Sequence, residues 1–198
     1  MESTHKFDMN TALLIIDIQN DYFPGGKMEL EGALEAGKKA GALLQCFREH
    51  GGQHIHIQHE SRKPGATFFI PGTDGIRIHD LVTHFEGEPI VHKQFPNSFR
   101  ETDLLEQLKA WKTERVVICG MMTHMCVDAT VRAAADLGFQ VIIVPDACAT
   151  RALSYGDVSV PAAHVHAAFL AAFKSYGMLM TAEEVISRLG AESTGSGD

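Results

Sequence analysis

The sequence predicts an α/β protein with three layers, α/β/α, around a mostly parallel, Rossmann-like central sheet. Short and almost continuously apolar runs, bounded by turn residues, are typical of strands buried on both faces. They alternate with segments in which apolar residues recur at helical spacing. The chain has 198 residues, of which 45% are hydrophobic and 21% charged, enough for one domain with a sizeable core. We therefore expect a single domain over residues 1–198, with an ordered core at about 11–189 and short polar tails.

The strands and helices are expected to alternate in chain order. Strands are predicted at residues 11–16, 53–59, 89–92, 116–119, 141–144 and 177–180. Helices are predicted at residues 30–50, 104–111, 126–137, 162–173 and 181–189, with a further short helix at 76–84. Thr181 and Glu184 have the spacing of a capping box at the start of the last helix. The segment 60–75, interrupted by prolines and glycines, is predicted to be a binding loop.

Composition and charge exclude several classes of function. The formal net charge is −8, so no basic stripe is available to neutralise nucleic-acid phosphates. No apolar run reaches the roughly 18 residues that a membrane span requires. The N-terminal segment MESTHKFDMN is polar and lacks the apolar core of a signal peptide. We therefore expect a cytoplasmic protein that acts on a small molecule and binds neither nucleic acid nor membrane.

One cysteine differs from the others in its place along the chain. The four cysteines form no CxxC pair and have no regular spacing, which argues against a disulfide framework or a zinc site. Most are expected to be buried packing residues. Cys126, however, lies where an apolar strand ends and a helical pattern begins. Unpaired backbone N–H groups and the helix dipole lower the pKa of a thiol there and can hold an oxyanion, so Cys126 is a candidate nucleophile.

Two charged residues also follow predicted strands. Asp17 comes directly after the strand at 11–16, and Lys93 follows the short strand at 89–92. A carboxylate in this position is costly to bury without a partner, and ligands bind at the carboxyl ends of strands in open α/β sheets. Three strands would then present Asp17, Lys93 and Cys126 at one edge of the sheet, where we predict the functional site.

Three separated motifs carry a resemblance to a known family. They are D-x-Q-N-D at 17–21, VHKQFPNSF around Lys93, and GMMTHMCV at 120–127, with T-x-R and DACAT downstream. With these motifs in this order, about Thr11 to Ile186 resembles the isochorismatase-like cysteine hydrolases, whose members include nicotinamidase, N-carbamoylsarcosine amidohydrolase and ureidoacrylate-type amidases. The resemblance implies cleavage of a C–N bond in a small amide, carbamoyl or ureido compound.

The resemblance also implies a role for each catalytic residue. Cys126 attacks the carbonyl carbon to form a thioester, Asp17 takes and returns the proton, and Lys93 stabilises the anions. The backbone N–H groups of Met122 and Cys126 hold the oxyanion, and the peptide bond between Met121 and Met122 is cis. A thiol is only a few per cent ionised at pH 7. Because Lys93 favours the thiolate and Asp17 opposes it, the three groups are expected to titrate together.

Two departures from family patterns narrow the expected chemistry. Metal-dependent nicotinamidases carry D-x-H after the second strand, and the two ligand positions here are His59 and Ser61. The resemblance therefore implies neither a metal nor another cofactor, and it argues against nicotinamidase activity. True isochorismatases tend to lack the catalytic cysteine, so Cys126 favours cleavage of a C–N bond.

The resemblance gives weaker expectations for the surroundings of the site. Gln19, Tyr22, Phe23 and Phe99 are expected to line the substrate pocket. His124 is expected to be a non-catalytic neighbour. Because active sites in this superfamily lie near subunit contacts, a homo-oligomer, either a dimer or a tetramer, is expected.

Three alternatives remain open from the residues. A catalytically inactive member would bind a small ligand or scaffold an oligomer, although retention of all three catalytic residues argues against it. A redox protein would pair Cys126 with Cys148, the one candidate resolving cysteine. A metal hydrolase would use His54, His56 or His59, but the alternation of residues 53–59 explains the first two as part of a half-exposed strand face.

Overall fold

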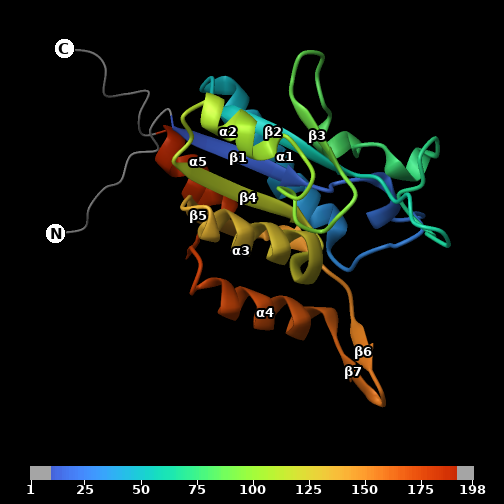
Figure 1. Cartoon of the computed structure of the whole chain (residues 1–198). Coiled ribbons are helices and arrows are strands. Elements are labelled where there is room, and N and C mark those ends of the chain that lie inside the picture. Colours follow the sequence, from blue (N-terminus) through green and yellow to red (C-terminus); the bar gives the residue numbers. More distant parts are fainter. Residues whose placement is uncertain (1–9, 191–198) are drawn as a thin grey trace, which may run out of the picture.

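The computed structural model describes residues 10–190, and these residues form one sheet between two layers of helices (Figure 1). Residues 1–9 and 191–198, in the predicted polar tails, lie outside the described residues. The main sheet in the described part has six strands, all parallel, in the order β3-β2-β1-β4-β5-β8. The strands are β1 (Thr11–Ile16), β2 (Gln53–His59), β3 (Ile90–Lys93), β4 (Arg115–Met121), β5 (Gln140–Ala149) and β8 (Met178–Leu179). The predicted three-layer fold with a parallel sheet is confirmed.

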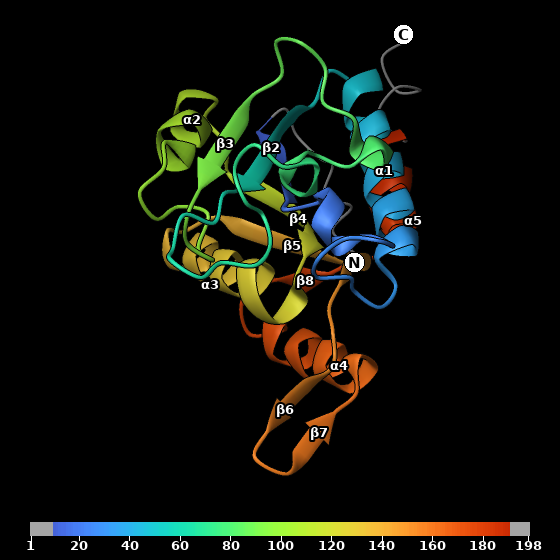
Figure 2. The ribbon, with the colours of Figure 1, turned by 90° about the vertical axis from the view of Figure 1, so that its right-hand side faces the viewer.

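Helices cover both faces of the sheet, as Figure 2 shows. The helices are α1 (Ala33–Glu49), α2 (Leu104–Ala110), α3 (Asp128–Asp136), α4 (Ala162–Phe173) and α5 (Ala182–Gly190). Helices α1 and α5 pack on one face, and α2, α3 and α4 lie on the other. Strand β1 serves both cores, because Leu13 and Ile15 face α1 while Leu14 and Ile16 face the opposite layer. Each such buried side chain contributes about 1.5–3 kcal/mol, which explains why β1 is apolar from Ala12 to Ile16.

Two segments differ from the predicted elements. The segment 76–84 forms no α-helix; it contains the last residue of the 3₁₀ turn η2 (Asp74–Ile76) and the whole of the 3₁₀ turn η3 (Asp80–Val82). After β5 the chain forms an antiparallel hairpin of β6 (Leu153–Tyr155) and β7 (Val158–Val160), which projects from the body of the molecule (Figures 1 and 2). Its strands have three residues each, too few for a periodic pattern to predict them.

The predicted half-exposed face of the histidine-rich strand β2 is confirmed for His54 and Gln58, which are half-buried, but it is wrong for His56. His56 in β2 is only 1% exposed, since the ring of His84 lies 5.5 Å away and Glu88 covers the same side. His54 pairs with Glu88 at 3.0 Å, and Arg48 donates to both carboxylate oxygens of Glu88 at 2.7 Å. The histidine pair therefore belongs to an ion-pair network that already contains a guanidinium cation, which weakens the metal interpretation of His54 and His56.

The capping box predicted at the start of α5 is confirmed. The Thr181 amide donates to the Glu184 carboxylate at 2.7 Å, and the Glu184 amide donates to the Thr181 hydroxyl at 3.2 Å. These bonds satisfy amides that have no partner within the helix. None of the helices in residues 10–190 is both long and apolar enough to cross a membrane.

Candidate active site

The carboxyl ends of β1, β3 and β4 bring three predicted residues together. Asp17 follows β1, Lys93 ends β3, and Cys126 lies in the turn after β4. Asp17 Oδ2 accepts a hydrogen bond from Lys93 Nζ at 2.8 Å. Side-chain ligand atoms of Asp17, His59 and Cys126 all lie within 4.8 Å of one another. This closeness follows from the parallel sheet, because the carboxyl ends of its strands meet at one edge.

The backbone of Asp17 bends sharply where β1 ends. Its φ is 50°, in the left-handed region that non-glycine residues rarely adopt, and its amide donates to the Ile57 carbonyl at 3.0 Å. A conformation of this kind costs about 1–3 kcal/mol and persists where the surroundings enforce it. The bend ends β1 and coincides with complete burial of the carboxylate.

The Lys93 ammonium group contacts several partners in the site. Besides Asp17, Nζ contacts His59 Nδ1 at 3.0 Å and donates to the Phe95 carbonyl at 3.2 Å. Burial lowers the pKa of Lys93, but the charges of Asp17 and Cys126 raise it, and the net result is a raised pKa. The ammonium is therefore a fixed positive charge at the centre of the site.

Cys126 is a buried thiol in the resting site. Burial raises its pKa, Asp17 raises it further, and Lys93 opposes both, so that the pKa lies well above its usual value. The lowered pKa expected from the start of the helix is therefore wrong, since burial and the Asp17 carboxylate outweigh the helix dipole. A nucleophilic role for Cys126 consequently needs a base that removes the proton during attack.

The turn that carries Cys126 differs in detail from a simple helix start. A π-helical turn spans Thr123–Val127 and runs directly into α3, so the helical segment begins before Cys126. The peptide bond between Met121 and Met122 is cis, as the resemblance implies. The Met122 carbonyl accepts from the amides of Met125 at 3.0 Å and Val127 at 3.2 Å. These bonds fix the Met122 end of the turn.

Gly120 allows this turn to approach β1. Its φ is 131°, and a Cβ atom there would collide with the Ile16 carbonyl. Glycine is thus required where β4 passes the end of β1. The close approach places the chain after β4 next to Asp17, the residue that follows Ile16.

Gln19 was predicted to line the substrate pocket, but it lies in the interior of the protein. It is fully buried, and its amide donates to the carbonyls of His59 and Ile76 at 3.0 and 2.8 Å. Its side-chain oxygen accepts from the His59 amide at 2.8 Å. Gln19 therefore ties the end of β1 to the end of β2 and positions the site without offering a group to a substrate.

The three aromatic residues predicted as pocket walls point in different directions. Tyr22 is buried and packs against Phe69, with ring centres 4.6 Å apart. Its pKa is raised by burial first and then by the charges of Cys126 and Asp17, so it lies close to the site. Phe23 stacks on His79 beside a separate hollow of about 480 Å³. Phe99 stacks on Phe139 in the opposite core, so it is not a wall of the predicted substrate pocket.

A hollow of about 620 Å³ lies on the side of His59 and Met125, and Asp17, Lys93 and Cys126 are not among the residues that line it. Residues 61–66 and 94–96 line it, together with His59 and Met125. His59 connects it to Lys93, and Met125 precedes Cys126 in the chain. The loop 60–75 was predicted to bind, and its first half does line this hollow. Sequence reasoning missed the place of His59, although the register of β2 and β3, which pairs His59 with Lys93, explains it.

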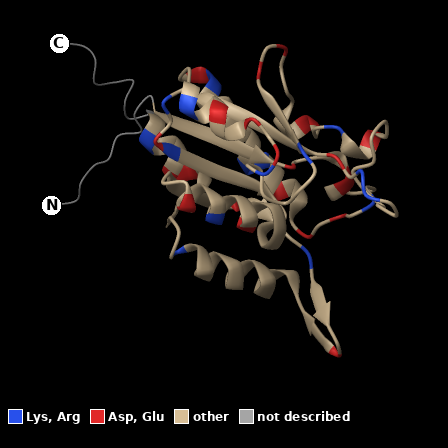
Figure 3. Ribbon diagram, in the orientation of Figure 1, with Lys and Arg blue, Asp and Glu red and all other residues tan. Residues whose placement is uncertain are grey.

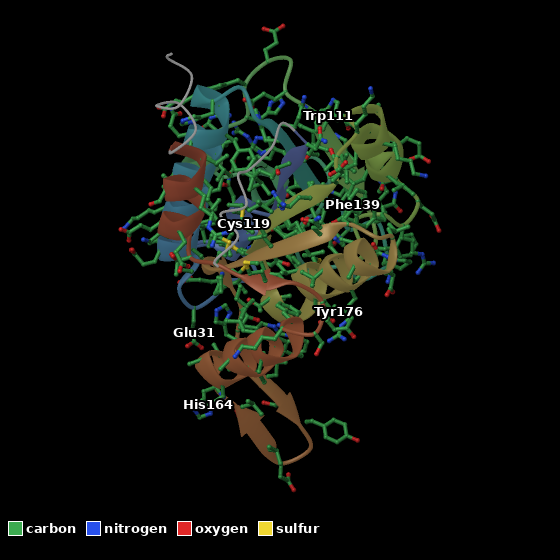
Figure 4. The ribbon with its side chains drawn as sticks, turned by 90° about the vertical axis from the view of Figure 1, so that its left-hand side faces the viewer. Glu31, Trp111, Cys119, Phe139, His164 and Tyr176 are labelled. Atoms are coloured by element: carbon green, nitrogen blue, oxygen red, sulfur yellow. The ribbon has the colours of Figure 1, made fainter. Side chains whose placement is uncertain are left out.

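The remaining candidate residues are His124 and the other three cysteines. His124 Nδ1 lies 2.6 Å from the Thr150 hydroxyl, which agrees with a non-catalytic neighbour. All four cysteines are free and buried. Burial raises the pKa of Cys148 to about 12, and Cys119 lies in the interior of the molecule (Figure 4).

Asp17, His59 and Cys126 could together approach a metal ion, but a cation is already present among them. The Lys93 ammonium contacts both Asp17 Oδ2 and His59 Nδ1. A metal ion would have to displace this buried ammonium from two partners. The donor set as it stands therefore fits an ammonium group better than a metal.

Comparisons with known proteins identify the family and the fold of this chain. The isochorismatase domain model matches residues 11–184. The isochorismatase family protein YddQ of Bacillus subtilis is 48% identical over 176 residues, which are 88% of this chain and 98% of that protein. A crystal structure titled as an isochorismatase hydrolase from Oleispira antarctica has a TM-score of 0.87 and 44% identity, and the match covers 92% of this chain and 99% of that chain.

Three more distant relatives have names that state a hydrolysis. Streptothricin hydrolase of Streptomyces noursei is 34% identical over 77% of this chain and 55% of its own length. Maleamate amidohydrolase of Pseudomonas putida is 26% identical over 73% of this chain and 75% of its own length. Nicotinamidase 3 of Arabidopsis thaliana is 27% identical over 74% of this chain and 78% of its own length.

Proposed function

Because the chain belongs to the isochorismatase family of hydrolases, we propose that it is a metal-independent cysteine hydrolase that cleaves a C–N bond of a small amide, carbamoyl or ureido compound. The reaction proceeds through a thioester on Cys126. Relatives named maleamate amidohydrolase and nicotinamidase support an amide as the target. The family membership itself confirms the resemblance drawn from the three sequence motifs.

The observation that carries this proposal is the unequal use of the two Asp17 oxygens. Oδ2 holds Lys93, whereas Oδ1 is buried and has no hydrogen-bond partner among the described residues. A buried carboxylate oxygen without a partner is costly. It is also the kind of group that can take a proton from a neighbouring thiol, and Cys126 lies within reach of Asp17. Asp17 is therefore the general base of the proposed reaction.

The first half of the reaction joins Cys126 to the substrate. The thiol transfers its proton to Asp17 as the sulfur attacks the carbonyl carbon, and the carbonyl oxygen becomes an oxyanion. The amides of Met122 and Cys126 donate to this oxyanion, and the Lys93 ammonium offsets the added negative charge. Asp17 then returns the proton to the leaving nitrogen. The C–N bond breaks and leaves a thioester on Cys126.

The second half releases the acid. Asp17 removes a proton from a water molecule, whose oxygen attacks the thioester carbonyl through the same oxyanion site. The C–S bond breaks and the proton returns to the Cys126 sulfur. One water is consumed for each amide cleaved, and the site regains the buried thiol with which it began.

Release of ammonia from a panel of amides tests this function. The panel contains maleamate, nicotinamide and N-carbamoyl amino acids, each incubated with the wild type and with Cys126→Ala. We expect hydrolysis of at least one compound by the wild type, no detectable hydrolysis by Cys126→Ala, and no change after dialysis against a chelator. Cys148→Ala, another buried thiol, is the matched control and should remain active.

Three outcomes would contradict the proposal. If Cys126→Ala remains active, the thioester mechanism fails. A chelator that abolishes activity, with recovery on addition of zinc or iron, would restore the metal alternative. Binding of a panel compound without any hydrolysis would favour the alternative of an inactive ligand-binding member.

We also propose that the protein is a homo-oligomer, because helix α4 and the β6–β7 hairpin form an exposed apolar face. Helix α4 has no acidic or basic residue other than histidine, and Figure 3 shows it without Lys, Arg, Asp or Glu. A helix that is apolar on all sides is usually buried, yet Ala168 and Ala172 are exposed, and His164 points outward (Figure 4). On the neighbouring hairpin, Tyr155 and Val158 are 91% and 64% exposed. We assign this face to contact with a second copy of the chain.

A charge placed in this face should separate the subunits. Ala168→Glu would bury a carboxylate in the proposed contact between subunits. The molecular mass of this variant, measured by light scattering, should therefore be that of a monomer, whereas the wild type should have the mass of a dimer or tetramer. Leu34→Glu is the matched control, because Leu34 is also an exposed apolar residue but lies on α1. A monomeric wild type, or equal masses for wild type and Ala168→Glu, would contradict the assignment.

A cytoplasmic location is part of the same proposal. All four cysteines are free, and free thiols persist in reducing compartments. The location is tested by fractionation of the source cells with an antibody against the protein. Recovery outside the cytoplasmic fraction would contradict it.

A further inference from the structure

The contact between Lys93 and His59 fixes the position of the proton on the histidine ring. An ammonium group has three donors and no acceptor. At 3.0 Å from Lys93 Nζ, His59 Nδ1 must therefore be the acceptor and carry no proton. A neutral imidazole has its proton on one nitrogen, so the proton of His59 is on Nε2.

The surroundings keep His59 neutral. Burial lowers the pKa of its imidazole, and Lys93 and Lys63 lower it too, while Asp17 raises it; the net result is a lowered pKa. Gln19 fixes the backbone on both sides of the residue, because it donates to the His59 carbonyl and accepts from the His59 amide. The ring is thus held in one orientation and in one tautomer.

The protonated edge of His59 is the edge available to a ligand. His59 lines the hollow of about 620 Å³, together with Met125, the residue before Cys126, and the side chain of His59 is 15% exposed. Nδ1 is used by Lys93, and within residues 10–190 this is the one hydrogen bond of the His59 ring, so Nε2 has no partner there. The site therefore offers a fixed N–H donor next to the thiol.

The charges along the hollow indicate what this donor meets. Its charged lining residues are Arg62 and Lys63, and none of the lining residues is acidic, although the whole chain has a net charge of −8. Arg62 is paired with Glu60 at 2.7 Å. Lys63 has no ion-pair partner within residues 10–190. Lys63 is thus a positive charge on the lining of the hollow that no carboxylate in residues 10–190 offsets through an ion pair, and such a charge attracts anions.

We propose that His59 acts at both edges of its ring: Nδ1 positions the Lys93 ammonium beside Asp17, and the Nε2–H donates to a carboxylate on the substrate, which Lys63 attracts. The inference rests on the proposed function and deepens it. The substrate is then a small amide that carries a carboxylate a few bonds from the scissile carbonyl. Neutral amides of the same size are poorer substrates, because they leave the N–H of His59 without an anionic acceptor.

Protection of Cys126 from iodoacetamide by two matched ligands tests this inference without requiring turnover. Maleate has two carboxylates, and isocrotonate has a methyl group in place of the second. We expect maleate to protect Cys126 in the wild type at concentrations at least about tenfold lower than isocrotonate, since a hydrogen bond to a charged group is worth about tenfold to a hundredfold in affinity.

Variants at His59 separate its two roles. His59→Asn retains an acceptor near the Nδ1 position for Lys93 but lacks the Nε2–H, so the preference for maleate, measured against the unprotected labelling rate of the same variant, should be lost. His59→Gln places an amide N–H near the Nε2 position and should recover part of the preference. Lys63→Gln should reduce the preference, and Lys38→Gln on α1, which lies on another face, should leave it unchanged.

The two proposals fail in different ways. A wild type with no preference for maleate, or a His59→Asn variant with an unchanged preference, would overturn the role of His59. The proposed function would instead fail through the absence of hydrolysis for every amide in the panel. If maleamate is hydrolysed, the His59→Asn variant should raise its KM much more than it lowers kcat, and an equal KM in both proteins would overturn the inference.

Discussion

Asp17→Asn is expected to lower kcat/KM for amide hydrolysis by about 10²–10⁴-fold, the usual contribution of a general base. The asparagine carbonyl oxygen can still accept from Lys93, so the ammonium stays in place. The amide cannot take the proton of Cys126, and each half of the reaction needs that transfer. Hydrolysis rates of a panel amide at neutral pH, measured for both proteins, check the loss.

An unfolded variant would also lose activity, so the stability of Asp17→Asn is measured separately. Asp17→Asn leaves the buried Lys93 ammonium without its counter-charge, so its free energy of unfolding should fall by about 3–5 kcal/mol. Hydrolysis is therefore compared under conditions in which circular dichroism shows both proteins to be folded. Asp74→Asn, at an exposed carboxylate, should hydrolyse amides at the wild-type rate. Wild-type hydrolysis by Asp17→Asn would exclude Asp17 as the base.

Lys93→Met is expected to lower the free energy of unfolding by about 3–5 kcal/mol, the usual cost of breaking a buried ion pair. The variant leaves Asp17 as a buried carboxylate without its cation, and both side chains are fully buried in the native protein. Urea unfolding curves of the two proteins at pH 7 give the difference.

A double variant identifies the source of this loss. Asp17→Asn/Lys93→Met removes both charges, so it should recover most of the lost stability. Lys38→Met breaks an ion pair in which both side chains are exposed, and its effect should stay below about 1 kcal/mol. If the double variant is as unstable as Lys93→Met, the cost comes from packing and not from the unpaired carboxylate.

The sequence alone was sufficient to predict the α/β fold and to predict that Asp17, Lys93 and Cys126 lie together. Asp17, Lys93 and Cys126 each follow an apolar strand, and in a parallel sheet such positions share an edge. The resemblance added their order and the cis peptide bond. These features depend on strand ends and chain order, and both are visible in the pattern of apolar residues.

Features set by side-chain direction and burial were not predictable in the same way. Phe99 lies in a predicted pocket loop but turns to Phe139 in the other core, and no period in the sequence gives that rotation. The pKa of Cys126 was expected to fall because of the helix start, whereas burial and Asp17 raise it. His59 was one histidine of three in β2, and only the register with β3 singles it out.

The most direct test of the central claim is the pH dependence of Cys126 labelling by iodoacetamide, followed by peptide mass spectrometry in the wild type and Asp17→Asn. Asp17 raises the pKa of Cys126 and Lys93 lowers it. Removal of the Asp17 charge should therefore shift the labelling midpoint of Cys126 to lower pH, so that the variant labels faster at neutral pH although it hydrolyses more slowly. Identical labelling profiles in the two proteins would show that Asp17 does not act on the Cys126 thiol and would contradict the proposed mechanism.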